Sequence, residues 1–111
     1  MAERRIETRL LCADLVNLDW TDKAGQKRRA VANLEDISLL GACVQLDFPM
    51  PLGTVVRVKY PQGKLSGTVK YCVFREIGYF TGIEFDAGSR WKLRNYRPQH
   101  LLDPRLLKRP D

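Results

Sequence analysis

The stretch KLSGTVKYCVFREIGYFTGIEF, residues 64–85, carries a strong strand pattern. Runs typical of strands cover residues 64–76 and 79–85, with residues 77–78 between them, and along the chain apolar and polar side chains alternate predominantly with a period of two. This alternation is typical of β-strands that bury one face. Gly67, inside the first run, indicates a bulge or a bend. The stretch therefore predicts two strands joined by a short turn.

The same alternation continues toward the N-terminus, where turn-forming residues separate further runs. Glycine or proline occurs in the connections 21–26, 49–53 and 61–63, and both residues favour turns over strand interiors. The predicted strands are residues 9–19, 27–35, 42–48, 54–60, 64–76 and 79–85. Six antiparallel strands with short connections predict an all-β fold, closed into a barrel because closure leaves no exposed edge.

The two ends of the chain differ from this central part. Residues 1–9 are predicted to form a flexible N-terminal arm, residues 9–86 the barrel, and residues 87–111 a basic C-terminal tail. Proline is tolerated in the first turn of a helix, so a short helix is possible at 98–103 or at 104–108. We expect short helical turns there rather than one long helix.

Composition and charge limit the classes of function. The chain has 111 residues, is 44% hydrophobic and carries a formal net charge of +6, which predicts one globular domain with an anionic partner. Residues 3–9 are charged where a signal peptide would be apolar, and no apolar run approaches the ~18 residues of a membrane span. We therefore expect a cytoplasmic protein without membrane insertion.

The sequence offers little for metal binding or catalysis. Its three cysteines, Cys12, Cys43 and Cys72, form no CxxC pair, and His100 is the only histidine. These numbers argue against zinc and against a disulfide framework, so we expect free thiols in a reducing compartment. No phosphate-binding loop and no catalytic nucleophile pattern is present. The sequence thus predicts no metal, no cofactor and no enzymatic activity.

Most aromatic residues are expected to pack rather than to bind. Trp20 and Trp91 are predicted to pack in the core or at its rim. Four further aromatic residues on the predicted strands are interpreted as core: Tyr60, Tyr71, Phe80 and Phe85.

The N-terminal stretch ERRIETRLLC, residues 3–12, brings arginines next to an apolar run. Arg5 and Arg9 are spaced as R-x-x-x-R, and each guanidinium is a planar fork that matches phosphate oxygens and the O6/N7 edge of guanine. The alternative is a solvated terminus, whose pairs with Glu3 and Glu7 would contribute little.

The stretch DISLLG, residues 36–41, lies between two predicted strands. Asp36 and Ser38 favour a turn because their short side chains bond to nearby backbone amides, and Gly41 would supply a positive φ. A turn alone would use these residues. A carboxylate is also an acceptor for the ring N–H and amino group of guanine, which makes the stretch a candidate binding site.

Together the two motifs resemble the PilZ domain, the bacterial receptor module for cyclic di-GMP. The motifs read R-x-x-x-R and D-x-S-x-x-G, with 27 positions from Arg9 to Asp36. The end of the barrel region is similar to the family's G-x-V…G…G-I-x-F ending, here Gly67, Val69, Gly78, Gly82, Ile83 and Phe85. The resemblance covers nearly the whole chain up to about Asp86.

This resemblance implies a six-stranded PilZ-type barrel, usually followed by a helix, and an arginine clamp on the ligand. Arg5 and Arg9 would grip the guanines and phosphates of cyclic di-GMP. Arg4 would be a third clamp if the ligand binds as an intercalated dimer.

The resemblance also assigns residues of the barrel. Asp36 and Ser38, on the barrel surface, would bond to the ligand, chiefly to the guanine edge. Gly41 would shape the turn, and Gly82 would leave room beside the base.

The resulting hypothesis is a cyclic di-GMP receptor or adaptor in bacterial second-messenger signalling. Ligand binding would order the arm and reposition the tail, and a separate, unidentified downstream protein would respond. One alternative is a degenerate PilZ-like adaptor that binds protein but no nucleotide.

Nucleic acid is a further alternative, motivated by seven cations against one acid between Arg90 and Arg109. The absence of interleaved exposed aromatics on the strands argues against it. Lys27, Arg28 and Arg29 either extend the anionic site or are solvated; we favour solvation.

Overall fold

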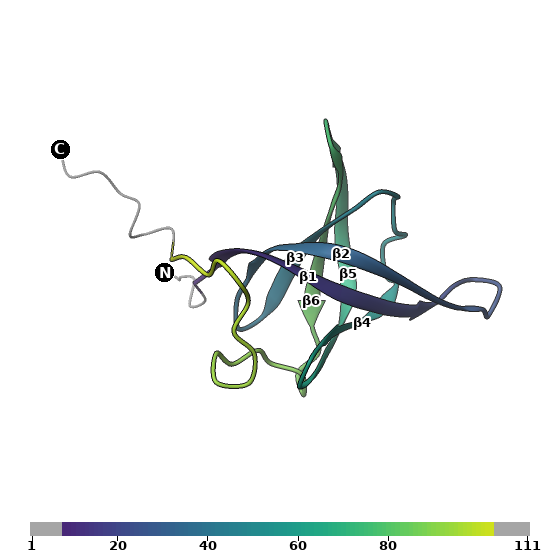
Figure 1. Ribbon diagram of the computed structural model, residues 1–111. Helices are drawn as coiled ribbons and strands as arrows, with labels where there is room; N and C mark the ends of the chain where they lie inside the picture. The colour runs from purple at the N-terminus through teal and green to yellow at the C-terminus, as the bar shows by residue number, and fades with distance from the viewer. Residues whose placement is uncertain (1–7, 104–111) are drawn as a thin grey trace, which may run out of the picture.

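The pattern at residues 64–85 forms a hairpin of β5 (Gly63–Arg75) and β6 (Gly78–Phe85). The computed structural model describes residues 8–103. Its other strands are β1 (Leu10–Thr21), β2 (Lys27–Ile37), β3 (Gly41–Leu46) and β4 (Val55–Tyr60). They close into an antiparallel barrel in the order β1-β2-β3-β6-β5-β4 (Figure 1). The predicted six-stranded barrel is confirmed, and each predicted strand end lies within two residues of the observed one.

The interior of the barrel takes its side chains from alternate positions of the strands. Leu18, Leu34 and Val56 are completely buried, and each such burial contributes about 1.5–3 kcal/mol. Trp20 and Trp91 belong to the same cluster, as predicted. The inward-facing apolar positions therefore account for the closed barrel.

Three irregularities interrupt the regular pairing, and the first lies between Leu11 and Asp14 of β1. Pairing passes from Leu34 directly to Asp36 on β2, which leaves Glu35 as the extra residue. On β5 it passes from Val69 to Tyr71, so Lys70 is the extra residue, three positions after the predicted bulge or bend at Gly67. A bulge shifts the alternation by one residue, so the side chains that follow it change faces.

The segment after β6 runs back along the start of β1 (Figure 1). β1 pairs with β4 only over 17–20, so the edge of its first half is open on that side. Leu102 fills part of that edge, exchanging two N–H···O bonds of 2.7 Å with Leu11. Because these backbone groups bond to β1, residues 98–103 form no helix. The predicted alternative at 104–108 lies outside the described residues, as do residues 1–7 of the predicted arm.

Aromatic packing holds this returning segment on the barrel. The Tyr96 ring stacks on Tyr60 with a centroid distance of 4.4 Å, and the Tyr96 hydroxyl donates to an Asp14 carboxylate oxygen at 2.7 Å. The Trp91 indole N–H donates to the Tyr96 carbonyl at 2.8 Å. Between residues 8 and 103, no helix is long and apolar enough to cross a membrane.

Candidate functional site

Four neighbouring strands bring their outer faces together at one level of the barrel. Asp36 on β2 pairs with Cys43 on β3, Cys43 pairs with Gly82 on β6, and Gly82 pairs with Tyr71 on β5. We call these four residues the four-strand row. Two of the irregularities lie directly beside it, at Glu35 and Lys70.

Tyr71 lies on the outside of the barrel, where it is 41% exposed. Its prediction as a core residue is wrong because the bulge at Lys70 turns the side chain outward. The ring lies against Gly82, and a Cβ at that position would overlap it. The room that Gly82 was expected to leave for a base is therefore filled by Tyr71 in this structure.

The Tyr71 side chain also interacts with the thiol of Cys43, which is only 5% exposed. Burial and the neighbouring Cys43 thiol raise the pKa of Tyr71 to about 12, so its hydroxyl is protonated at neutral pH. Burial raises the pKa of the Cys43 thiol as well. The row thus presents a neutral, partly exposed aromatic ring beside the Asp36 carboxylate.

The two sequence motifs meet at the Asp36 end of the row. Arg9 Nη1 lies 2.5 Å from Asp36 Oδ1, and the two side chains are 47% and 21% exposed. Leu11 pairs with Asp36, which places the start of β1 beside the end of β2. The predicted proximity of Arg9 and Asp36 is thereby present, whereas Arg4 and Arg5 lie outside the described residues.

Ser38 and Gly41 form the turn that connects β2 to β3. Ser38 is fully buried, and both its N–H and its hydroxyl donate to the Gly41 carbonyl, at 2.8 and 3.3 Å. The expected surface position of Ser38 is therefore wrong, because the hydroxyl is turned into the turn that it closes. Its expected bond to a ligand stays a prediction.

Gly41 has no positive φ, so that prediction is also wrong. A Cβ at Gly41 would overlap the Ile83 carbonyl of the neighbouring strand. Glycine is required here because β3 and β6 approach closely, and the residue shapes the turn only indirectly.

A cavity of about 280 Å³ opens over the row; its lining includes Arg9, Gly41, Lys70, Tyr71, Gly82 and Glu84. Lys70 Nζ lies 3.4 Å from Glu84 Oε1, so two cations and one acid surround the hollow. Its volume is slightly below the roughly 300–1,000 Å³ of typical small-molecule sites, so it would enclose only part of a dinucleotide.

Sequence analysis missed Tyr71 and Lys70 as residues of the site. The sequence did indicate an extra residue here. Regular pairing outward from the turn places Tyr71 opposite Gly82, and it would next place Lys70 opposite Ile83; however, Val69 and Ile83 both face inward and pair with each other. These two requirements are compatible only if one extra residue is present between Val69 and Tyr71.

No potential metal site occurs between residues 8 and 103, where no three His, Cys, Asp or Glu side chains cluster suitably. The three cysteines are free; Cys12 and Cys43 are buried and Cys72 is partly exposed.

Comparison with solved structures places this fold among known ones. The chain is similar to the PilZ domain of YcgR from Escherichia coli with c-di-GMP, with a TM-score of 0.60 and 16% identity over 78% of this chain and 81% of that one. It is also similar to YcgR in complex with c-di-GMP, with a TM-score of 0.58 and 18% identity over 78% of this chain. This chain spans only 40% of that second structure. No family model and no curated protein matches the sequence.

Proposed function

Starting from the PilZ fold of this chain, we propose that it binds cyclic di-GMP at the four-strand row and acts as a receptor in bacterial signalling. The observation that carries the proposal is the contact between Arg9 and Asp36, which joins the two motifs beside the cavity. The two similar structures, both containing c-di-GMP, support the choice of ligand.

The Arg9–Asp36 pair suits an exchange of partners on binding. The Asp36 carboxylate can accept the ring N–H and amino group of guanine, and Arg9 can then turn to a phosphate or to the O6/N7 edge. The pair is partly exposed, and such pairs contribute only about 0–1 kcal/mol. Charge-assisted bonds to the ligand, about 1.5–3 kcal/mol each, can therefore replace it.

Other residues of the row have supporting roles in this proposal. The exposed face of Tyr71 offers a surface against which a purine can stack. Ser38 and Gly41 position Asp36 by fixing the turn that follows it. Arg5 completes the clamp from the arm, and Arg4 adds to it if two stacked ligand molecules bind.

The C-terminal segment offers a route from the ligand to a partner. Leu11 pairs with Asp36 on one side and with Leu102 on the other. A ligand that displaces Arg9 from Asp36 would act on the start of β1, and thus on the returning segment. We propose that a downstream protein reads this change, and that the chain acts as an adaptor without enzymatic activity.

Calorimetric titration with cyclic di-GMP, with GTP as the control ligand, tests the proposal. Arg9→Ala and Asp36→Ala should each weaken binding about 10–100-fold, the equivalent of one lost charge-assisted hydrogen bond. Arg29 and Asp19 form a matched cross-strand pair elsewhere on the barrel, at 3.9 Å, so Arg29→Ala and Asp19→Ala should bind like the wild type.

A molar ratio near two ligands per chain would support the stacked dimer and the role of Arg4. If wild-type protein took up no cyclic di-GMP, or if all four variants bound equally well, the receptor proposal would be wrong. A folded chain that binds no nucleotide would instead favour the protein-only adaptor.

A further inference from the structure

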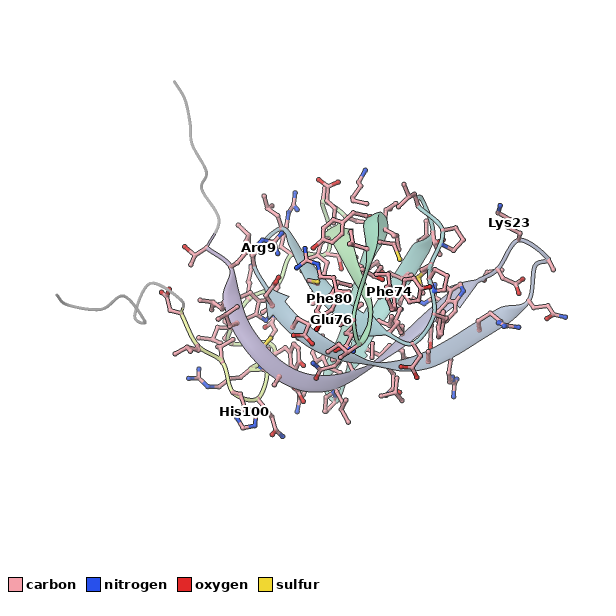
Figure 2. The ribbon with its side chains drawn as sticks, turned by 90° about the horizontal axis from the view of Figure 1, so that it is seen from above. Arg9, Lys23, Phe74, Glu76, Phe80 and His100 are labelled. Carbon is pink, nitrogen blue, oxygen red and sulfur yellow. The ribbon has the colours of Figure 1, made fainter. Side chains whose placement is uncertain are left out.

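A second hollow lies at the other end of the molecule from Arg9. It is a groove of about 760 Å³ between the tip of the β1–β2 hairpin and the connection from β3 to β4. We call it the hairpin groove and define it by residues 20–24, 51–55 and Arg57. Figure 1 shows this hairpin extending beyond the barrel, and Figure 2 places Lys23 near its tip, far from Arg9.

The groove has an apolar surface. Trp20, Pro51, Leu52 and Val55 line it, and Leu52 and Val55 are 66% and 57% exposed. Trp20 is nearly buried, with its ring 5.9 Å from that of Phe48. The apolar area available to a partner therefore comes mainly from aliphatic side chains.

Cations surround this apolar surface. Lys23 and Arg57 line the groove itself. An adjoining hollow of about 350 Å³ shares Trp20 and Arg57 with it and adds three cations and one acid: Lys27, Arg28, Arg29 and Asp19. With Asp22 in the groove, the two hollows hold five cations and two acids.

The two acids neutralise these cations only in part. Arg28 lies 3.8 Å from Asp22 and Arg29 lies 3.9 Å from Asp19, and both arginine side chains are more than half exposed. Asp19 also pairs with Lys59 at 3.2 Å. Within residues 8–103, Lys23, Lys27 and Arg57 make no ion pair.

These cations are too far from the four-strand row to extend it. Arg29 precedes Asp36 by seven residues on the same strand, β2. At about 3.3 Å per residue that separation is roughly 23 Å. The cationic groove is therefore a separate feature of the surface.

We propose that the hairpin groove docks a polypeptide segment of a partner protein that carries both acidic and aliphatic side chains. Aliphatic side chains would pack on Leu52, Val55 and Pro51, and carboxylates would pair with the surrounding cations, above all Arg57. The proposal rests on this complementarity and not on nucleotide binding.

Two other polyanions fit the groove less well. A single-stranded nucleic acid needs exposed rings for base stacking, and Trp20 is only 8% exposed. An anionic membrane favours apolar side chains that project from a convex surface, whereas here they line a hollow.

The test is selection from a random peptide library against the full chain at physiological salt, followed by titration of the enriched peptides. We expect sequences that combine Asp or Glu with Leu, Ile or Val. Leu52→Ser and Arg57→Ser should each weaken their binding about tenfold or more. Ile77→Ser and Lys64→Ser are matched controls, because Ile77 is 70% exposed and Lys64 is exposed, both outside the groove.

Several outcomes would overturn the proposal. These are the absence of any enriched acidic and aliphatic sequence, or enriched peptides that bind the two groove variants as well as the wild type. The proposal would also be wrong if the binding of duplex DNA, or of vesicles of phosphatidylcholine and phosphatidylserine, depended on Leu52 and Arg57 while the binding of peptides did not. Both groove variants should still bind cyclic di-GMP like the wild type, so this test and the nucleotide test fail independently.

Discussion

The four-strand row and the hairpin groove occupy different parts of one barrel and are built in different ways. The row lies within the wall, where two bulges and two glycines determine which side chains face outward. The groove lies between a hairpin tip and a loop, and its residues need only be exposed. A site within a β-barrel wall therefore depends on backbone geometry, whereas a site between loops depends on which loops the fold brings together.

The two sites also differ in the arrangement of their charged side chains. In the row, the Arg9–Asp36 pair is short, at 2.5 Å, and lies beside an aromatic ring. In the groove and the adjoining hollow, the arginine–aspartate pairs are near 3.8–3.9 Å, and cations outnumber acids. We infer that the row favours a small ligand with defined hydrogen-bonding groups, and the groove a flexible acidic partner.

The largest effect is expected from adding one methyl group beside the row. In Gly41→Ala, the new Cβ meets the Ile83 carbonyl, a backbone atom that cannot move away, so the free energy of unfolding should fall by about 2–3 kcal/mol. Gly53→Ala, in the groove, meets no atom within 4 Å and should cost only about 1 kcal/mol, from its φ of 87°. Urea unfolding of both variants measures the difference; equal losses would contradict the close approach of β3 and β6.

An intermediate effect is expected at Gly82. Its new Cβ would meet the Tyr71 ring, which is the movable end of a side chain, so Gly82→Ala should remain folded while the ring is displaced. Cys43 should then become accessible, and its alkylation at neutral pH should accelerate about tenfold. Mass spectrometry of the alkylated peptides reads this out for each cysteine. Unchanged Cys43 labelling in both Gly82→Ala and Tyr71→Ala would show that the ring does not shield the thiol.

The pH dependence of stability should reflect the thiol at the row end of β1. Burial, with Asp36 and Asp14 nearby, raises the pKa of Cys12 from 9.0 to about 12. Between those values the unfolded chain releases the proton and the folded chain keeps it, so stability should fall as the pH rises. The urea concentration at the midpoint of unfolding should fall as the pH rises above neutral, and it should fall less in Cys12→Ala than in the wild type. An identical alkaline loss in that variant would assign the loss to other groups.

The smallest effects are expected from the ion pairs beside the groove. Arg28→Ser and Arg29→Ser remove long, exposed pairs and should each change the free energy of unfolding by less than about 0.5 kcal/mol. Thermal unfolding at low and high salt provides the measurement. A loss above about 1 kcal/mol in either variant would mean that these cations stabilise the hairpin, and would weaken the case for a docking surface.

Much of the barrel was predictable from local pattern. The runs over 64–76 and 79–85 predicted two strands, and the turn-forming residues predicted where the other strands begin and end. The resemblance of the two motifs to the PilZ family implied that Arg9 and Asp36 lie close together, and the two side chains are in contact.

Other features depend on pairing between distant strands. The bulge at Lys70 follows from how β5 aligns with β6, and it moved Tyr71 from the predicted core to the outer face. Ser38 is buried because its hydroxyl closes a turn, which its residue type alone did not reveal.

The sequence by itself determined the strands and the closed barrel, since these depend on periodicity and on the positions of turn-forming residues. Only the tertiary structure decided which face Tyr71 occupies, which atoms make Gly41 and Gly82 necessary, and that residues 20–24 and 51–55 enclose one groove. Those properties arise when segments far apart in the chain come into contact, and no local pattern encodes the register in which they meet.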